Sequence, residues 1–358
     1  MKLNKGGNLQ TLQHPVRIDA STQAIFQPSS SLTKNTCAPT GSFILKFSPA
    51  VFLHAYVLLG ESPQRFGSDL SLYLATVNSF FAKSPTVQTG FVSLVGITQT
   101  DTKKRLSEDL GVALSSLFMA EAFGVTWDTI AQIPQNSKLS KKRPDFECFD
   151  TTGNRHLFEA KGTTVLAGVD VALTKAIAQV KKYPESANTK LAIVSFLSTD
   201  DRLFPSQTFV VDPPTLPDNI PPTKRVAQLL HGEKILQFAG LPQTGAAYMK
   251  ALSVKLRAES AGNGQVAPIE KGPGLLMKLN QEIEQSALQV RQIGNTQFVG
   301  RSIFDGLGVH IFVGATRRQL DALALLADMA TGDTYSRLQG DDFHSFFADG
   351  TCLLIERS

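Results

Sequence analysis

The sequence contains few cysteines, and their arrangement is not that of a disulfide-rich or zinc-binding protein. Only three are present among 358 residues, Cys37, Cys148 and Cys352, and no two of them form a C-x-x-C pair. An odd number of widely spaced cysteines argues against a disulfide framework and against a cysteine-based structural zinc site. We therefore expect a protein of the reducing cytoplasm.

Long apolar segments are also missing. The longest apolar stretch, PAVFLHAYVLLG, includes a histidine and is shorter than the roughly 20 residues that a membrane-spanning helix needs. The start of the sequence, MKLNKGGNLQ, is polar and lacks the apolar core of a secretory signal. The sequence thus predicts no role in a membrane.

Several common catalytic and nucleotide-binding motifs are absent too. The sequence contains no P-loop, GxGxxG or GxSxG motif, which argues against a nucleotide-driven motor. Its six histidines show no metal-ligand spacing. What the chain does have is an ordinary globular composition, with 42% hydrophobic and 18% charged residues. The formal net charge of +4 permits a nucleic-acid partner without requiring one.

The hydrophobic pattern divides the chain into successive parts. Residues 1–40, rich in Gln, Ser, Thr and Pro, predict a loosely ordered N-terminal arm. Residues 41–212 contain N-terminal elements and, at about 100–211, a core with the order helix, hairpin, helix and strand, which predicts an α/β fold with a mixed β-sheet. Residues 213–223 predict a proline-rich linker, and residues 224–358 an α/β region without a recognisable motif.

The strongest local signal is the segment RPDFECFDTTGNRHLFEAKG. A three-residue hairpin loop commonly ends in a glycine, and Gly153 fits that position. Counting back from the turn places Asp145 opposite Glu159, with Cβ atoms about 4.5–5.5 Å apart. Two carboxylates this close repel each other unless a cation lies between them. Mg²⁺ takes oxygen ligands of this kind while keeping several waters, so the hairpin predicts a Mg²⁺ site, with Mn²⁺ as the alternative ion.

Strand alternation adds a third functional group. Lys161 lies two residues after Glu159 and therefore projects from the same face, whereas Ala160 points away and offers its backbone carbonyl as a further metal ligand. An ammonium beside a metal-bound water orients that water or stabilises charge on a scissile phosphate. We therefore predict a centre able to hydrolyse phosphodiester bonds, with Asp145, Glu159 and Lys161 as its catalytic residues. A surface hairpin with a structural ion pair is the competing interpretation.

The sequences Pro144-Asp145 and Glu159-Ala160-Lys161 resemble the central motif of the PD-(D/E)xK nuclease superfamily, and the resemblance extends over roughly residues 100–200. It implies a restriction-endonuclease-like core, a mixed β-sheet flanked by helices, with N- and C-terminal α/β elaborations. It also implies that Asp145 and Glu159 bind Mg²⁺ and that Lys161 assists the attacking water.

Helices on either side of the motif extend the resemblance. Members usually have a preceding helix whose acid helps to hold metal; Glu108 matches that placement, and Glu121 is its rival. One large branch carries Gln-x-x-x-Tyr on the following helix, and Gln179 and Tyr183 have that spacing. Tyr183 also fits an ordinary packing position, and the upstream acid of that branch is usually spaced differently, so the subfamily stays open.

Basic residues cluster around the hairpin, as a path for a phosphate backbone requires. The candidates for DNA contact are Lys141, Lys142, Arg143, Lys175, Gln179 and Lys182. By resemblance we expect a DNA endonuclease of restriction or phage defence, acting as a homodimer or with other defence subunits. The alternatives are a structure-specific repair nuclease or resolvase, and an inactive DNA-binding or scaffold protein of the same fold.

Overall fold

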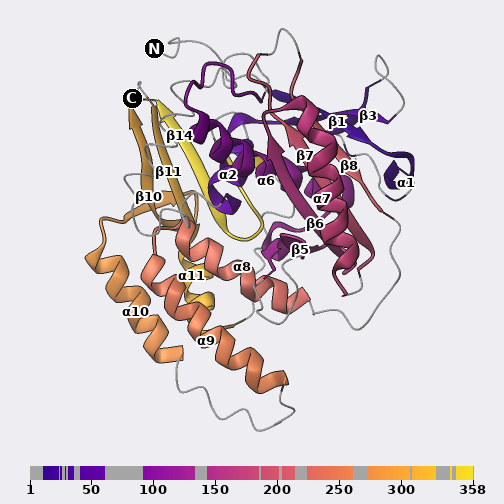
Figure 1. The fold of residues 1–358 in the computed structure, drawn as a ribbon. Coiled ribbons are helices and arrows are strands. Elements are labelled where there is room, and N and C mark those ends of the chain that lie inside the picture. The colour runs from indigo at the N-terminus through magenta and orange to yellow at the C-terminus, as the bar shows by residue number, and fades with distance from the viewer. Residues whose placement is uncertain are drawn as a thin grey trace.

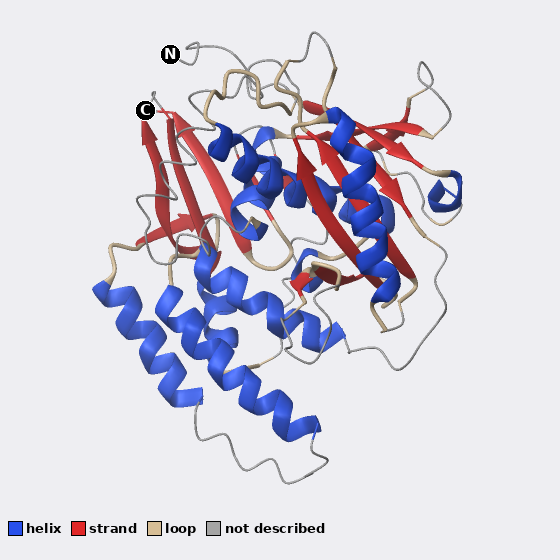
Figure 2. Cartoon of the chain, in the orientation of Figure 1, coloured by secondary structure: helices blue, strands red, loops and turns tan. Residues whose placement is uncertain are grey.

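The computed structural model shows a mixed α/β fold in which helices flank β-sheets (Figures 1 and 2), and this confirms the coarse prediction of a mixed β-sheet flanked by helices. The structure describes residues 11–23, 25, 29, 31–35, 41–60, 92–133, 143–184, 187–200, 204–213, 224–260, 272–306, 309–327, 339–340 and 344–357. Within these ranges one sheet has eight strands in the order β2-β3-β1-β8-β7-β6-β5-β4, and the other has six in the order β12-β13-β14-β11-β10-β9.

The larger sheet contains the predicted hairpin. Its strands are β1 (Leu12–Ile18), β2 (Leu32–Lys34), β3 (Ser42–Phe47), β4 (Ala131–Gln132), β5 (Phe146–Phe149), β6 (Arg155–Thr163), β7 (Thr189–Phe196) and β8 (Gln207–Val211). The sheet is mixed, because β6 and β7 are parallel and β1 and β8 are parallel, whereas β5 pairs antiparallel with β6 and β7 antiparallel with β8. The hairpin β5–β6 therefore lies beside a parallel pair.

The prediction of a loosely ordered arm over residues 1–40 is wrong for residues 12–18, which form strand β1. It lies between β3 and β8, and its apolar residues Leu12, Val16 and Ile18 are at most 3% exposed. His14 is buried beside them, with Nε2 at 2.9 Å from Thr208 Oγ1 across 194 positions of sequence. The polar and proline residues between the apolar ones hide the alternation, and the partner strand is far along the chain.

Three helices pack around this sheet: α2 (Pro49–Leu59), α6 (Thr100–Phe123) and α7 (Val169–Lys182). Every residue of α2 is buried, as expected for a helix that is apolar on all sides. It contacts α6 on one side and the C-terminal strands β13 and β14 on the other. Helix α7 runs along the outer face of β6 and β7 (Figure 1).

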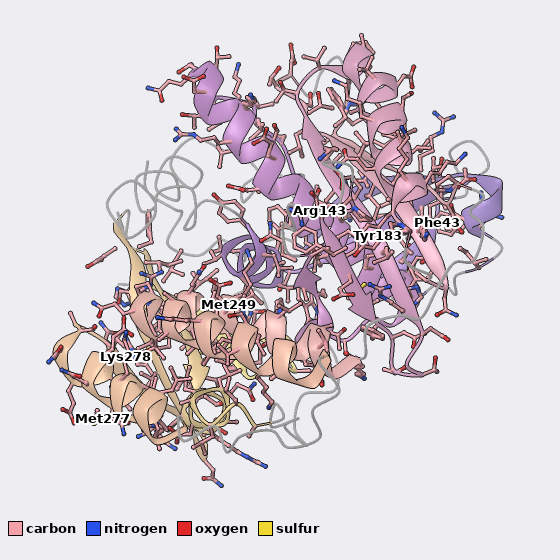
Figure 3. The ribbon with its side chains drawn as sticks, turned by 60° about the horizontal axis from the view of Figure 1, so that its bottom comes forward. Phe43, Arg143, Tyr183, Met249, Met277 and Lys278 are labelled. Carbon is pink, nitrogen blue, oxygen red and sulfur yellow. The ribbon has the colours of Figure 1, made fainter. Side chains whose placement is uncertain are left out.

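The C-terminal region forms the second sheet and a group of helices. Its elements are α8 (Lys224–Phe238), α9 (Pro242–Ser260), α10 (Gly272–Gln285), β9 (Gln289–Ile293), β10 (Thr296–Gly306), β11 (Val309–Thr316), α11 (Arg317–Ala324), β12 (Gln339–Gly340), β13 (His344–Phe346) and β14 (Thr351–Arg357). Met249 on α9 and Met277 and Lys278 on α10 mark these helices in Figure 3.

The predicted division at 213–223 does not separate two independent cores. One hydrophobic cluster joins Leu12 of the larger sheet and Phe118 of α6 to Ile311 and Leu353 of the smaller sheet. Helix α2 has apolar surface for both sheets, so the two regions bury each other. Residues 214–223 themselves lie outside the described ranges.

Buried polar groups also cross this junction. His54 of α2 lies with Nδ1 at 2.9 Å from Ser345 Oγ and Nε2 at 2.8 Å from Thr351 Oγ1. His231 of α8 lies with Nδ1 at 2.6 Å from the Ile130 carbonyl oxygen, and its Nε2 lies 2.8 Å from Asp349 within the C-terminal region. In the part of the chain that the structure describes, no helix combines the length and the apolar character needed to cross a membrane.

Two of the buried histidines make stability sensitive to acid. Burial lowers the pKa of His14 and of His54 from 6.5 to about 3. Because the folded-state pKa lies below the unfolded value, their contribution is fully present above pH 6.5 and is lost as the pH falls toward 3. We expect each to remove about 1.4 kcal/mol of unfolding free energy per pH unit in that interval.

Urea unfolding at about pH 7.5 and about pH 5.5, where most carboxylates stay ionised, measures this effect. In a His54→Gln variant the difference between the two midpoints should be smaller than in the natural chain. Equal midpoints at both pH values in the natural chain would contradict the prediction.

Candidate active site

The β5–β6 hairpin has the predicted turn and register. Gly153 adopts φ +89°, and the Asp150 backbone N–H donates to the Asn154 carbonyl at 3.0 Å. Phe149 pairs with Arg155, as predicted from the three-residue loop. The Asp150 carboxylate accepts hydrogen bonds from the backbone N–H groups of Thr152 at 2.9 Å and Asn154 at 2.8 Å. These hydrogen bonds stabilise the turn and thereby the register in which β5 pairs with β6.

Asp145 lies directly before β5, at the position where the register would pair it with Glu159. Its carboxylate Oδ2 accepts a hydrogen bond from the backbone N–H of Ala160 at 3.3 Å. Lys161 Nζ lies 3.6 Å from the same oxygen and also contacts Glu159 Oε1. The structure thus brings the three predicted catalytic side chains together, with Lys161 between the two acids.

Burial differs sharply among these three groups. The Glu159 side chain is 0% exposed, whereas the side chains of Asp145 and Lys161 are 34% and 36% exposed. Burial, and next the charge of Asp145, raises the pKa of Glu159 despite the opposing charge of Lys161. Burial lowers the pKa of Lys161, but the two carboxylates outweigh it and the net shift is upward.

Glu159 Oε2 has no hydrogen-bond partner among the described residues. A buried carboxylate oxygen without a partner costs free energy that a nearby cation would offset. Asp145 and Glu159 are oxygen ligands of the type that Mg²⁺ prefers, and Mg²⁺ usually keeps several waters beside one or two carboxylates. The residues therefore fit such an ion. No group of three or more His, Cys, Asp or Glu side chains suited to a metal is found in the described ranges. Water and substrate oxygens would therefore complete the coordination of a bound Mg²⁺.

A close crossing of α6 over β6 determines which acid of α6 approaches the hairpin. A Cβ added at Gly162 would meet the Ser107 carbonyl oxygen at 1.6 Å and the Glu108 backbone nitrogen at 2.8 Å. Glu108 therefore lies in the helical turn that covers Lys161 and Gly162. Its rival Glu121 lies on the last turn of α6, where Oε2 accepts a hydrogen bond from Ser29 Oγ at 2.6 Å.

Glu108 also lines a pocket on this part of α6. The pocket residues are Asp101, Lys104, Arg105 and Glu108. Two cationic and two anionic side chains from consecutive helical turns thus surround an open space beside the crossing.

Helix α7 supports the segment that precedes Asp145. Gln179 Nε2 donates to the Arg143 carbonyl oxygen at 3.1 Å, and the Arg143 guanidinium donates to the Ile133 carbonyl. Both residues were predicted to contact DNA; in the structure each donates a hydrogen bond to a backbone carbonyl. Tyr183 is 4% exposed and packs with Ile133 and Leu157, which confirms it as a packing residue.

The remaining predicted DNA contacts fall into two groups. Lys175 and Lys182 are exposed on α7. Lys141 and Lys142 lie outside the described ranges. Val165 and Leu166, which belong to no predicted site, are exposed in the turn after β6. In the sequence these two aliphatic residues stand between Thr163-Thr164 and Ala167-Gly168 and match no binding motif.

Comparisons of the chain with protein-family models, with curated proteins and with solved structures found no match. What bears on function is therefore the chemistry of the hairpin and of the helices that cover it.

Proposed function

We propose that this protein is a metal-dependent nuclease that hydrolyses DNA phosphodiester bonds. The observation that supports it most strongly is the cluster of Asp145, Glu159 and Lys161, in which a fully buried carboxylate has an oxygen without a hydrogen-bond partner. The competing interpretation, a structural ion pair on a surface hairpin, predicts two exposed partners, and such pairs contribute little to stability. The full burial of the Glu159 side chain disfavours that interpretation.

The roles of the three residues follow from their placement. Asp145 and Glu159 would hold Mg²⁺, or Mn²⁺ in its place, with the Ala160 carbonyl as a further candidate ligand; Glu108 does not form a three-acid metal group with them in the described ranges. When bound, the ion supplies Lewis-acid stabilisation of phosphate charge and activation of water. Lys161 keeps its ammonium protonated between the acids and is partly exposed, so it can stabilise negative charge that develops on a phosphate.

The order of elements is consistent with a restriction-endonuclease-like core, which we propose as the finer fold assignment. Helix α6 precedes the strands β4, β5 and β6, and α7 connects β6 to its parallel neighbour β7. A role in restriction or phage defence, as a homodimer or with other defence subunits, is proposed on the resemblance alone. A repair nuclease or resolvase is the alternative within the same chemistry, and an inactive DNA-binding or scaffold protein is the alternative outside it.

Removal of the metal is the direct test. We expect the purified full chain to cleave supercoiled plasmid or linear DNA with Mg²⁺ or Mn²⁺, and to lose that activity in EDTA. Restored cleavage after excess Mg²⁺ is added back would show that the loss is reversible. DNA binding without cleavage in any divalent ion would instead favour the scaffold alternative, and equal cleavage in EDTA would exclude the proposed centre.

Gln179 provides a second prediction, because it holds the Arg143 carbonyl two residues before Asp145. We expect Gln179→Met to lower cleavage or metal affinity about 10- to 100-fold, the usual cost of losing a group that orients a ligand. Thr174→Val, an exposed change on the same helix, is the control and should have little effect. Single-turnover cleavage and metal titration measure both variants, and identical behaviour of the two would contradict the positioning role.

A further inference from the structure

The turn that follows β6 exposes an unusual concentration of aliphatic side chains. Val165 is 59% exposed, Leu166 38% and Val171 55%, all within seven residues of one another. Single exposed apolar residues are common on protein surfaces and need no explanation. Three so close together at the start of one helix form an apolar tip, which we define as Val165, Leu166 and Val171.

The apolar tip is held in place by its own turn. Thr163 Oγ1 accepts a hydrogen bond from the Val165 backbone N–H at 3.2 Å, and the Gly168 N–H donates to the Val165 carbonyl at 2.9 Å. At its base, the Leu197 N–H donates to the Thr163 carbonyl at 2.8 Å, and Val169 is buried against the sheet. The side chains are therefore presented by an ordered turn, which lowers the entropic cost of binding through them.

The tip lies a short distance along the chain from the candidate active site. Lys161 precedes Val165 by four residues, which span at most about 14 Å even when fully extended. Successive bases of one DNA strand are about 3.4 Å apart along the axis. A strand whose phosphate lies at Lys161 would therefore bring bases within about four nucleotides of the tip.

The same helix continues with positive charge. Lys175 lies one helical turn after Val171 on the same face, and Lys181 and Lys182 follow at the C-terminal end; all three are exposed. An apolar tip followed by a cationic edge is complementary to a partner with apolar bases and an anionic backbone. Phe204, 53% exposed, lies in the β7–β8 connection at the sheet edge where β6 and β7 both end.

We propose that the apolar tip is a wedge that inserts between bases of bound DNA beside the cleavage site. The inference rests on the proposed nuclease function and adds a substrate class to it: DNA that is locally unpaired or easily unstacked. Inserting aliphatic side chains into a stacked step costs a few kcal/mol. A mismatch or a single-strand/double-strand junction has already lost part of that stacking, so it is bound and cleaved in preference to a perfect duplex.

The test uses the full chain in EDTA, so that binding is measured apart from cleavage. The probes are a perfect duplex and a duplex with one mismatch, each carrying 2-aminopurine, whose fluorescence rises when the base leaves the stack. Val165→Ser with Leu166→Ser is the test variant. Val254→Ser with Val290→Ser, at positions 54% and 56% exposed on α9 and β9, is the matched control.

We expect the natural chain and the control to raise the fluorescence and to bind the mismatch about tenfold or more tightly than the perfect duplex. The test variant should give no rise and bind the two duplexes within about twofold. Binding without a fluorescence change in the natural chain would overturn the wedge, as would a test variant that behaves like the control or a chain that binds no DNA.

Three further outcomes distinguish the wedge from a dimer contact and from the nuclease function. If the natural chain is a dimer by light scattering and the test variant a monomer, the tip is covered by a second copy and the wedge is wrong. If unstacking fails but Mg²⁺-dependent cleavage persists and is abolished by Asp145→Asn, the nuclease function stands and only the wedge falls. If unstacking occurs without cleavage in any divalent ion, the wedge stands and the nuclease function falls.

Discussion

Replacing Lys161 by methionine should abolish most cleavage while leaving metal binding intact. Methionine keeps much of the length of the side chain but removes the ammonium that lies between Asp145 and Glu159. Loss of one electrostatic stabiliser of transition-state charge typically lowers the rate about 10²- to 10³-fold. Because the ammonium also competes with a cation for the two carboxylates, Mg²⁺ affinity should stay the same or increase.

Asp145→Asn should weaken metal binding as well as cleavage. The amide keeps the shape of the carboxylate but loses its charge, so both Mg²⁺ binding and cleavage should decline together. Calorimetric titration with Mg²⁺ and single-turnover cleavage of linear DNA measure the two properties separately. Lys46→Met, an exposed lysine on β3 far from the hairpin in the strand order, is the matched control and should match the natural chain. Unchanged cleavage in both active-site variants would refute the proposed residues.

Gly162→Ala should lower both the free energy of unfolding and the rate of cleavage. The added Cβ would lie 1.6 Å from the Ser107 carbonyl oxygen and 2.2 Å from its carbonyl carbon, both backbone atoms of α6. No side-chain rotation relieves such a contact, so α6 must move away from β6. Overpacking in a well-packed core costs about 1–3 kcal/mol and occasionally more, and this contact belongs at the upper end. A displacement of about 1 Å at Lys161 or Glu108 would lower cleavage about 10²-fold in addition.

Chemical unfolding and cleavage of the same preparations test this second prediction. Gly168→Ala is the control, since its φ is −84° and an added Cβ there would make only ordinary contacts at 3.6 Å or more; we expect it to be neutral or up to about 1 kcal/mol more stable. Gly111→Ala, with contacts of 2.9–3.1 Å to Lys161 and Gly162, should be intermediate. Gly162→Ala with the stability and activity of the Gly168 control would show that α6 does not press on the site.

The hairpin shows how far local rules extend. A glycine at the end of a three-residue loop and the two-residue period of a strand were enough to predict the pairing of Phe149 with Arg155 and the common face of Glu159 and Lys161. Both rules act over a few residues, so they operate in the same way whatever surrounds the hairpin.

The C-terminal region and the N-terminal strand show where such rules end. The polar character of residues 1–40 suggested a loose arm, yet β1 is an internal strand because β8, almost 200 positions away, supplies its parallel partner. The proline-rich segment suggested a boundary, yet α2 joins the two sheets in one core. Pairings of this kind depend on complementary surfaces that no short window of sequence contains.

The sequence by itself determined the chemistry offered by the hairpin: two acids and a lysine, adjacent through turn type and strand period. Only the tertiary structure decided that Glu159 is fully buried with an unpartnered oxygen, that the turn of α6 over Gly162 contains Glu108 and not Glu121, and that Gln179 supports the segment before Asp145. The reason is physical: burial and the choice between two acids on one helix depend on where α6 crosses β6, and the close approach of Gly111 and Gly162 sets that crossing.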